Sequence, residues 1–375
     1  MKIAVNTRLL LKDRLEGIGW FSYETLRRIT NSHKEHSFYF IFDRKYDESF
    51  IFSGNIEPHV LHPQARHPVL YYLWFERSIP RLLDKIKPDL FFSPDGYLSL
   101  NAKIKSMNVF HDLNFEHYPE DLPVTERKFY RYYFPQYARK AERIATVSEY
   151  SKRDIINQYD IEPSKIDVVY NGANENFCPA SEEEAEATRM AYTGGKPYFV
   201  FIGALHPRKN LVNLFKAYDY FRNNNDLDIK LLIVGKKKWW TKKIRDTYEG
   251  MDNKNDVIFA GRLGAQDLCK VLGSSLALTY VSYFEGFGIP ILEGFRCETP
   301  VITSNITSMP EVAGDAALLV NPFSVSSISE GMARIAKDET LRKELVMKGR
   351  IRKDSFSWDK TAGLLWDSME KALKT

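Results

Sequence analysis

The chain has 375 residues, enough for two domains of ordinary size, and its 53 basic and 49 acidic side chains leave a formal net charge of +4. So small a surplus gives no reason to expect a nucleic-acid partner, and 44% hydrophobic with 27% charged residues is typical of a globular protein rather than a disordered one. The longest apolar run, residues 198–205, is far shorter than the roughly 18 residues that a membrane span needs.

The cysteines and the first residues indicate a cellular compartment. Cys178, Cys269 and Cys297 are far apart in the sequence and form no CxxC pair, which fits a reducing environment. We therefore expect neither a disulfide scaffold nor a thiolate zinc site. Near the N-terminus the apolar residues 3–5 are interrupted by Asn6, too early for the hydrophobic core of a signal peptide. We expect a buried first strand there and a cytoplasmic protein.

Short apolar runs alternate with helix-length amphipathic stretches along the first half of the chain. The runs are residues 38–42, 90–93, 107–110, 143–147 and 166–170, and the amphipathic stretches are residues 18–29, 71–86 and 125–139. Such alternation predicts repeated strand–helix units, and hence a parallel sheet covered by helices.

A second series of the same kind follows in the other half. Its apolar runs are residues 198–203, 230–235, 257–261, 276–280, 300–303 and 316–320. The chain is thus predicted to be an α/β protein with two parallel-sheet domains, residues 1–180 and 190–355, joined near residues 178–197. At the start of this connection Ser181 precedes three glutamates, which predicts a capped helix. A last amphipathic segment, within residues 356–375, follows the second series.

The most informative stretch runs from Glu285 to Glu293 directly after a predicted strand. Gly286 and Gly288 allow a ligand to approach the backbone, and Pro290 suits the first turn of a helix. The free N–H groups and the dipole at a helix start favour phosphate. Two carboxylates flanking this turn suggest recognition of hydroxyl groups on both sides of a phosphate. The alternative is a strand-to-helix turn with a capping glutamate.

Two basic residues open the second domain. Arg208 and Lys209 follow its first predicted strand, where the next helix begins. Because Arg grips phosphate oxygens with its fork and Lys adds a point charge, a diphosphate held between this loop and the turn at residues 286–290 would be contacted from two sides. The alternative is a solvated basic helix start.

The first domain offers a glycine pair and a strand-end histidine. Gly17 and Gly19 open a helix after the first strand, but Ser22 stands where the dinucleotide fingerprint needs a third glycine, so this is either a ligand-facing loop or a simple turn. His111 ends a predicted strand, where α/β enzymes place working side chains, although a structural role is the alternative.

Other sites are not expected. His59, His62 and His67 lie among prolines in what reads as irregular chain, which argues against a metal site, and no GxSxG or P-loop sequence is present. Two basic-aromatic stretches, residues 127–134 and 236–243, suit a membrane surface or a sugar, but partly buried helix faces have the same pattern.

Taken together, these motifs resemble the retaining glycosyltransferases of family 4, also called group 1. The spacing from Glu285 to Glu293 is the E-x(7)-E element, residues 207–210 are the basic loop, and residues 308–317 are the segment downstream. The resemblance implies a GT-B fold, in which two Rossmann-like domains face a cleft and residues 356–375 cross back to the N-terminal domain. The N-terminal domain would then take the acceptor, and the C-terminal domain the nucleotide-sugar donor.

The resemblance also implies roles. Arg208 and Lys209 would neutralise the leaving diphosphate, Glu293 would bind ribose hydroxyls, and Glu285 would hold the transferred sugar, which His111 would contact from the other domain. The expected donor-binding positions are Gly17, Gly19, Arg262, Leu263, Phe287, Gly288, Ile289 and Glu293. Members of this family need no metal and no cofactor, and we expect none here.

The pattern looks most like mannosyl- and rhamnosyltransferases that build surface polysaccharide. GDP-mannose is the first expectation for the donor, with UDP- and dTDP-sugars left open, and the acceptor would be a glycan or a lipid-linked saccharide, with peripheral contact at the inner face of the membrane. A nucleotide-sugar 2-epimerase of GT-B fold and a non-catalytic nucleotide-sugar binder are the alternatives. A mere binder should have lost some of the four charged residues Arg208, Lys209, Glu285 and Glu293, and all four are present.

Overall fold

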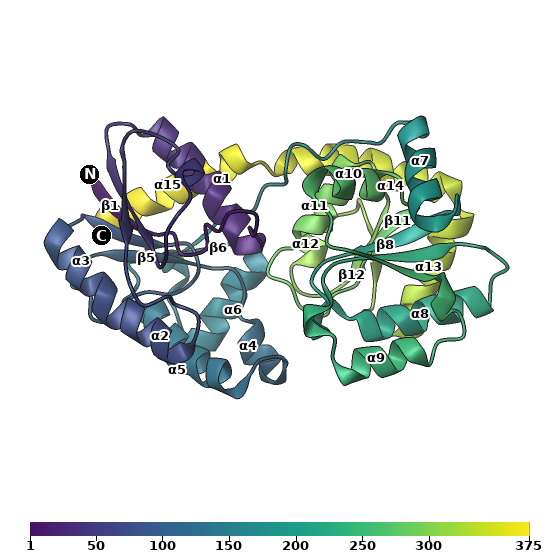
Figure 1. The fold of residues 1–375 in the computed structure, drawn as a ribbon, viewed down its shortest axis with the longest axis horizontal. Helices are drawn as coiled ribbons and strands as arrows, with labels where there is room; N and C mark the ends of the chain where they lie inside the picture. Colours follow the sequence, from purple (N-terminus) through teal and green to yellow (C-terminus); the bar gives the residue numbers. More distant parts are fainter. Residues whose placement is uncertain (375) are drawn as a thin grey trace. The chain divides into compact units, whose positions relative to one another are not determined.

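The computed structural model describes residues 1–374, and of Lys238 only the backbone. Thr375, the last residue of the predicted crossing segment, and the side chain of Lys238, in the second basic-aromatic stretch, lie outside this description. The chain forms two units, Met1–Gly172 with the residues from Ser357 onward, and Ala173–Phe356. Each unit is a parallel sheet with helices on both faces (Figure 1), so the prediction of two Rossmann-like domains is confirmed.

The sheet of the first unit has the strand order β3-β2-β1-β4-β5-β6-β7, and every neighbouring pair is parallel. The strands are β1 (Lys2–Asn6), β2 (Ser37–Phe42), β3 (Ile56–Val60), β4 (Leu90–Ser93), β5 (Ser106–Phe110), β6 (Arg143–Thr146) and β7 (Ile166–Val168). The chain builds outward from β1 to β3 and then returns to the other side of β1 with β4. This places a topological switch point between β1 and β4, where open α/β sheets bind ligands.

The helices of the first unit form two layers (Figure 1). They are α1 (Gly17–Ser32), α2 (Pro68–Leu73), α3 (Ile79–Ile86), α4 (Asn114–His117), α5 (Val124–Lys140), α6 (Glu149–Tyr159) and α15 (Trp358–Lys374). Helix α15 packs beside α1 and contacts β4, β5 and β6, while α2, α3 and α5 cover the other face. The predicted return of the last helix to the N-terminal domain is therefore confirmed, and Thr361 anchors it by donating to the Tyr170 carbonyl at 2.6 Å.

Two local expectations for this unit were wrong. The stretch around His59 is not irregular, because Ile56–Val60 forms β3, and Pro58 is tolerated there since β3 is the edge strand of the sheet. The expected helix over residues 71–86 is also not uniform, because a π-helical turn, Trp74–Ser78, joins α2 to α3.

The sheet of the second unit has the order β10-β9-β8-β11-β12-β13 and is parallel throughout. Its strands are β8 (Tyr198–Ile202), β9 (Lys230–Val234), β10 (Val257–Gly261), β11 (Ala277–Tyr280), β12 (Val301–Ser304) and β13 (Leu318–Val320). All six were expected from the sequence. The switch point of this sheet lies between β8 and β11.

Helices α8, α9 and α13 cover one face of this sheet, and α7, α10 and α11 cover the other (Figure 1). The helices are α7 (Glu182–Thr193), α8 (Leu211–Asn223), α9 (Lys242–Glu249), α10 (Ala265–Gly273), α11 (Ile289–Arg296), α12 (Met309–Ala313), α13 (Val325–Lys337) and α14 (Glu339–Arg352). Ser181 caps α7 in a capping box with Glu184, as predicted, and residues 178–197 belong to the second unit.

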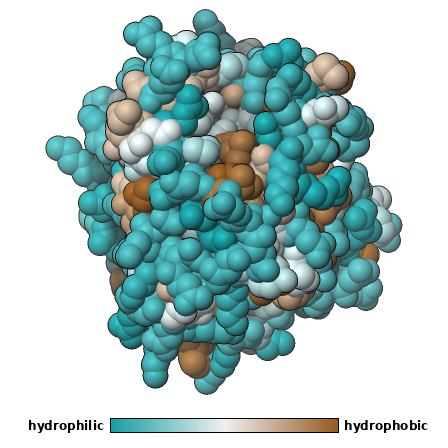
Figure 2. Space-filling model, turned by 90° about the vertical axis from the view of Figure 1, so that its right-hand side faces the viewer, coloured by the Kyte–Doolittle hydropathy of each residue, from teal (hydrophilic) through white to brown (hydrophobic). Residues whose placement is uncertain are grey.

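The face drawn in Figure 2 is mainly hydrophilic, with hydrophobic residues set between polar ones. Among residues 1–374, none of the helices combines the length and the apolar character that crossing a bilayer requires.

Candidate active site

Two cations and one carboxylate meet at the switch point of the second sheet. Arg208 and Lys209 lie in a short turn, Pro207–Lys209, in the loop that follows β8, and Glu285 lies in the loop after β11. Arg208 Nη1 donates to Glu285 Oε2 at 2.5 Å, and Lys209 Nζ donates to Glu285 Oε1 at 2.5 Å. Each carboxylate oxygen thus holds one of the two cations, and the two loops form one charged cluster.

Further contacts fix the position of these cations. Lys209 Nζ also donates to the Tyr280 hydroxyl at 2.6 Å. The next residue, Asn210, adopts φ +62°, a left-handed conformation that Asn tolerates well, and its amide donates to the carbonyls of Val281 and Pro322 at 2.9 and 2.7 Å. Because the basic loop is tied to the loops that follow β11 and β13, its charges are held in place before any ligand arrives.

Glu285 is ionised in this setting. Burial alone raises the pKa of its carboxyl, but the charges and hydrogen bonds of Arg208 and Lys209 outweigh burial and lower that pKa to about 2. The carboxylate is therefore a weak base, and both of its oxygens are engaged by cations.

The helix that the sequence predicts after the glycine turn is present. Gly288 adopts φ +105° and precedes α11, whose first turn contains Pro290. The hydroxyl of Ser308, just before α12, donates to the carbonyls of Glu285 and Phe287 at 2.9 and 3.0 Å. Ser308 thus holds the loop that carries Glu285, a role that the sequence did not reveal.

Glu293 lies one turn inside α11, partly buried. Burial raises the pKa of its carboxyl to about 7. At neutral pH the group is therefore close to half protonated, and it can both donate and accept hydrogen bonds.

Arg262 and Leu263 do not belong to the cluster of Arg208, Lys209 and Glu285. They follow β10, the edge strand, which β9 separates from β8. Arg262 is exposed there, whereas Phe287 and Gly288 are buried beside Glu285.

In the first unit, His111 stands at the carboxyl end of β5, as expected. Its Nε2 atom lies 2.8 Å from the carbonyl of Pro94, and its ring packs edge-on against Phe21 with centroids 4.9 Å apart. Burial lowers the pKa of this imidazole. Because a carbonyl can only accept, Nε2 carries the proton, and Nδ1 of the neutral ring is a hydrogen-bond acceptor.

The two glycines at the start of α1 differ in their surroundings. A Cβ at Gly19 would lie 3.0 Å from the Leu9 carbonyl oxygen and 3.2 Å from the Leu15 side chain, so close packing within the unit explains this glycine. A Cβ at Gly17 would meet nothing within 4 Å.

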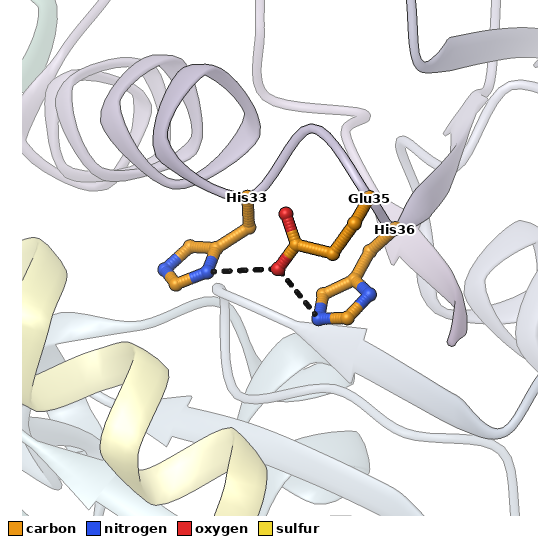
Figure 3. A group of neighbouring side chains, drawn as sticks. All are labelled: His33, Glu35 and His36. Atoms are coloured by element: carbon orange, nitrogen blue, oxygen red, sulfur yellow. Dashed lines mark ion pairs between the residues drawn. The ribbon is translucent and has the colours of Figure 1, made fainter.

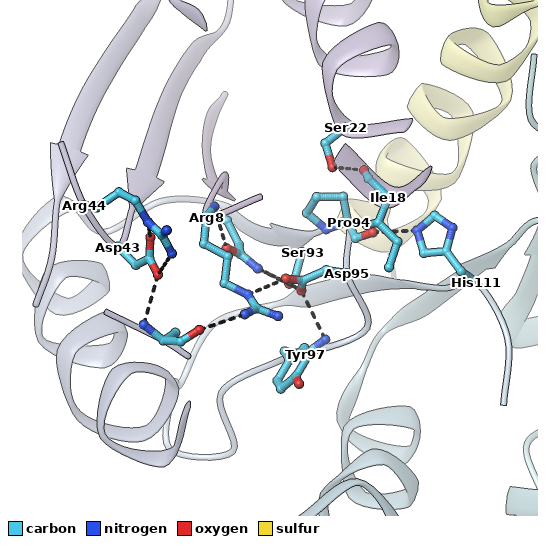
Figure 4. Close-up of polar contacts among 12 residues, drawn as sticks. Arg8, Ile18, Ser22, Asp43, Arg44, Ser93, Pro94, Asp95, Tyr97 and His111 are labelled. Atoms are coloured by element: carbon cyan, nitrogen blue, oxygen red, sulfur yellow. Dashed lines mark hydrogen bonds and ion pairs between the residues drawn. The ribbon is translucent and has the colours of Figure 1, made fainter. Parts of the chain in front are cut away.

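A buried polar network occupies the switch point of the first sheet, and sequence reasoning missed it (Figure 4). Asn6, the last residue of β1, donates to Ser93, the last residue of β4, at 2.9 Å and to Asp95 in the loop that follows at 2.8 Å, and Arg8 Nε donates to Asp95 at 2.6 Å. The Arg8 guanidinium also lies 4.5 Å from the centroid of the Tyr97 ring. The signal was present, since polar residues directly follow two predicted strands.

The three thiols are not scattered in space. The sulfur of Cys269 lies 3.9 Å from that of Cys178 and 4.0 Å from that of Cys297, and all three cysteines are free. Sequence spacing gave no sign of this grouping, which brings together α10, the residue after α11 and the segment before α7.

The aromatic residues of the first basic-aromatic stretch are largely explained by packing. Phe129 and Phe134 of α5 are buried in the core, and Arg131 pairs with Glu116 at 3.0 Å. Tyr132 is exposed.

Comparison with known families accounts for this arrangement. A family model of the glycosyl transferases group 1 matches residues 183–352, and a model of Glycosyltransferase Family 4 matches residues 16–177. The chain belongs to this glycosyltransferase family. The glycosyltransferase is 28% identical over 306 residues to the O-antigen chain mannosyltransferase B of Escherichia coli, a match that covers 78% of each chain.

A second relative is longer. The serotype-specific mannosyltransferase WbdA of Escherichia coli is 26% identical over 285 residues. The match covers 73% of this glycosyltransferase but only 34% of WbdA, so this chain spans about a third of that protein. Among solved structures, HepE of Anabaena in complex with UDP and glucose has a TM-score of 0.77 at 15% identity, with 99% of both chains covered. A glycosyltransferase of Rickettsia africae has a TM-score of 0.74 at 16% identity, with 100% and 99% covered. These likenesses support the GT-B fold.

Proposed function

We propose that this glycosyltransferase transfers mannose from GDP-mannose, with retention at the anomeric carbon, to a glycan or lipid-linked glycan of a surface polysaccharide. The observation that carries the proposal is the pair of cations, Arg208 and Lys209, fixed by Glu285 at the switch point of the second sheet. The choice of mannose rests on two relatives that are named as mannosyltransferases.

The cluster suits a leaving diphosphate. Two fixed cations, together with the positive end of α11, stabilise the charge that develops on the departing phosphate. No protein carboxylate cluster for a divalent ion is needed in such a site, so we propose that transfer requires neither a metal nor a cofactor.

The chemistry of Glu285 supports the proposal of retention. Glu285, with a pKa of about 2 and both oxygens bound to cations, is a poor nucleophile and a poor base. We therefore assign the proton of the acceptor hydroxyl to the leaving phosphate oxygen. The acceptor oxygen then forms its bond to the anomeric carbon on the face from which the phosphate departs.

The remaining roles are assigned by chemistry. Glu293, with its pKa near 7, suits the hydroxyl groups of ribose. The Nδ1 atom of His111 suits a hydroxyl of the transferred sugar. Arg262 and Leu263 are proposed to lie near the base. An acceptor carried on a lipid would bring the enzyme to the cytoplasmic face of a membrane. Exposed residues of α5 such as Tyr132 would then contact the membrane surface.

The test is transfer itself. Purified enzyme would be incubated with labelled GDP-mannose and a synthetic lipid-diphosphate-linked saccharide, beside parallel reactions with UDP-glucose and dTDP-rhamnose. We expect a mannosylated product from GDP-mannose, with an α anomeric proton by NMR. A β-linked product contradicts retention, and product from another donor alone contradicts the assigned sugar.

A further inference from the structure

The turn between α1 and β2 brings two imidazoles and a carboxylate together (Figure 3). His33 directly follows α1, and His36 directly precedes β2. The same oxygen of Glu35, Oε1, lies 3.7 Å from His33 Nδ1 and 3.3 Å from His36 Nε2. One donor atom from each residue lies within 4.8 Å of the other two.

Both imidazole rings are held by packing. The His33 ring stacks on Trp366 of α15, with centroids 3.7 Å apart and planes 15° apart. The His36 ring is parallel to that of His33 within 3° and lies 5.2 Å from Trp366. The other nitrogen of His36, Nδ1, lies 3.2 Å from the amine of Met1, which leaves Nε2 directed at Glu35. The two nitrogens therefore face one carboxylate in fixed orientations.

We propose that His33, Glu35 and His36 bind a divalent transition-metal ion, with Zn²⁺ as the first choice. Zinc bonds of about 2.0–2.2 Å to imidazole nitrogen and carboxylate oxygen place tetrahedral ligands roughly 3.4 Å apart. The two separations from Glu35 Oε1, 3.3 and 3.7 Å, bracket this value, and the two imidazole nitrogens lie within 4.8 Å of each other. Glu35 has 62% of its side chain exposed, so its carboxylate can adjust to the ion, with water as the fourth ligand.

The donor set decides the class of ion. Two nitrogens and one oxygen suit zinc and similar transition metals, whereas Mg²⁺ and Ca²⁺ prefer oxygen ligands. The site lies before β2, at the amino edge of the first parallel sheet, whereas His111 follows β5 at the carboxyl edge, where ligands bind in such sheets, so this metal is separate from the transfer chemistry. A bound ion would tie the turn after α1 to β2 and, through the stacked Trp366, would stabilise α15.

The alternative is a simple ion pair in which Glu35 neutralises a protonated histidine. Measurement of metal binding distinguishes a metal site from this ion pair. Untagged protein, treated with EDTA and dialysed, would be titrated calorimetrically with Zn²⁺ and separately with Mg²⁺. We expect one saturable Zn²⁺ site per chain, a raised melting temperature, slower hydrogen exchange in α15, and no response to Mg²⁺.

Three variants locate the site. Glu35→Gln keeps the size of an exposed side chain, and His36→Ala removes one imidazole while leaving the His33–Trp366 stack, so both should fold and lose at least about tenfold in Zn²⁺ affinity. The matched control is His59→Ala, which removes a histidine that pairs with Glu57 at 3.0 Å without a second imidazole, and which should bind Zn²⁺ as the wild type does. Absence of saturable Zn²⁺ binding, or binding that survives both Glu35→Gln and His36→Ala, would overturn the proposal.

Discussion

Lys209 Nζ and Glu285 Oε1 lie 2.5 Å apart although 76 positions separate the two residues in the chain. They meet because β8 and β11 are neighbours in the sheet, and the loops after both strands leave at its carboxyl edge. This ion pair joins the basic loop to the glycine turn. The positive charges that we propose to stabilise the leaving diphosphate are therefore in place without a ligand.

Arg208 should matter for turnover more than for folding. Its guanidinium is partly exposed, with 25% of the side chain accessible, so Arg208→Ala should leave the fold intact. Loss of one donor to the developing phosphate charge should lower kcat by on the order of a hundredfold. Initial rates with saturating GDP-mannose, alongside circular dichroism of both proteins, would measure this.

Arg208→Lys is the matched control. It keeps the charge but not the fork, and it should recover part of the lost rate. An unchanged kcat in folded Arg208→Ala would show that the basic loop does not serve the leaving group.

Deprotonation of Glu293 should lower the free energy of unfolding of the protein as the pH rises. Its pKa is raised from 4.5 to about 7, so between these values the folded state binds the proton that the unfolded state has released. Stability should therefore fall as the pH rises from about 4.5 to 7, by on the order of 3 kcal/mol at about 1.4 kcal/mol per pKa unit.

Glu293→Gln removes this penalty. The variant should be more stable than the wild type at pH 8 and nearly equal to it at pH 4, while binding GDP more weakly if the carboxyl contacts ribose. Urea unfolding at several pH values would compare the two proteins, and parallel pH profiles would contradict a buried, titrating Glu293.

Catalysis should not depend on a divalent ion. We expect the same initial rate in excess EDTA and with added Mg²⁺, because Arg208 and Lys209 supply the positive charge. Removal of Zn²⁺ from the His33 site should lower the melting temperature without changing this rate at moderate temperature. Loss of activity in EDTA that Mg²⁺ restores would show that a metal neutralises the diphosphate instead.

Asp95 should be a stability determinant of the first unit. It pairs with Arg8 in a buried position, where 9% of the arginine and 2% of the aspartate side chain are exposed. Asp95→Ala leaves the guanidinium without its charge partner and should destabilise the protein by about 3–5 kcal/mol in urea unfolding. Lys12→Ala, which breaks an exposed pair with Asp47 and leaves Asp47 to cap the turn that follows it, is the control and should have little effect. Equal losses in the free energy of unfolding of the two variants would mean that the buried Arg8–Asp95 pair stabilises the first unit no more than an exposed pair does.

The sequence by itself determined the strands, the helices that separate most of them and the loops that carry chemistry. Apolar runs marked 12 of the 13 strands, counting 7 in the first sheet and 6 in the second, and the missing one, β3, contains a proline that only an edge position tolerates. Local rules sufficed for Ser181 as a helix cap and for Gly288 before α11, because capping and turn conformations depend on a few adjacent residues.

The sequence predicted that the basic loop and the glycine turn share one ligand, but tertiary structure alone decided which side chains pair. The pairing of Glu285 with both cations, the Arg8–Asp95 network, the three neighbouring thiols and the stack of His33 on Trp366 all join residues from separate elements. Strand order and helix packing set these distances, and neither is written in the local pattern of one segment. The pKa values of Glu285 and Glu293 differ for the same reason: Glu285 is buried with two cations, whereas the pKa of the partly buried Glu293, eight positions further on, is shifted by burial without them.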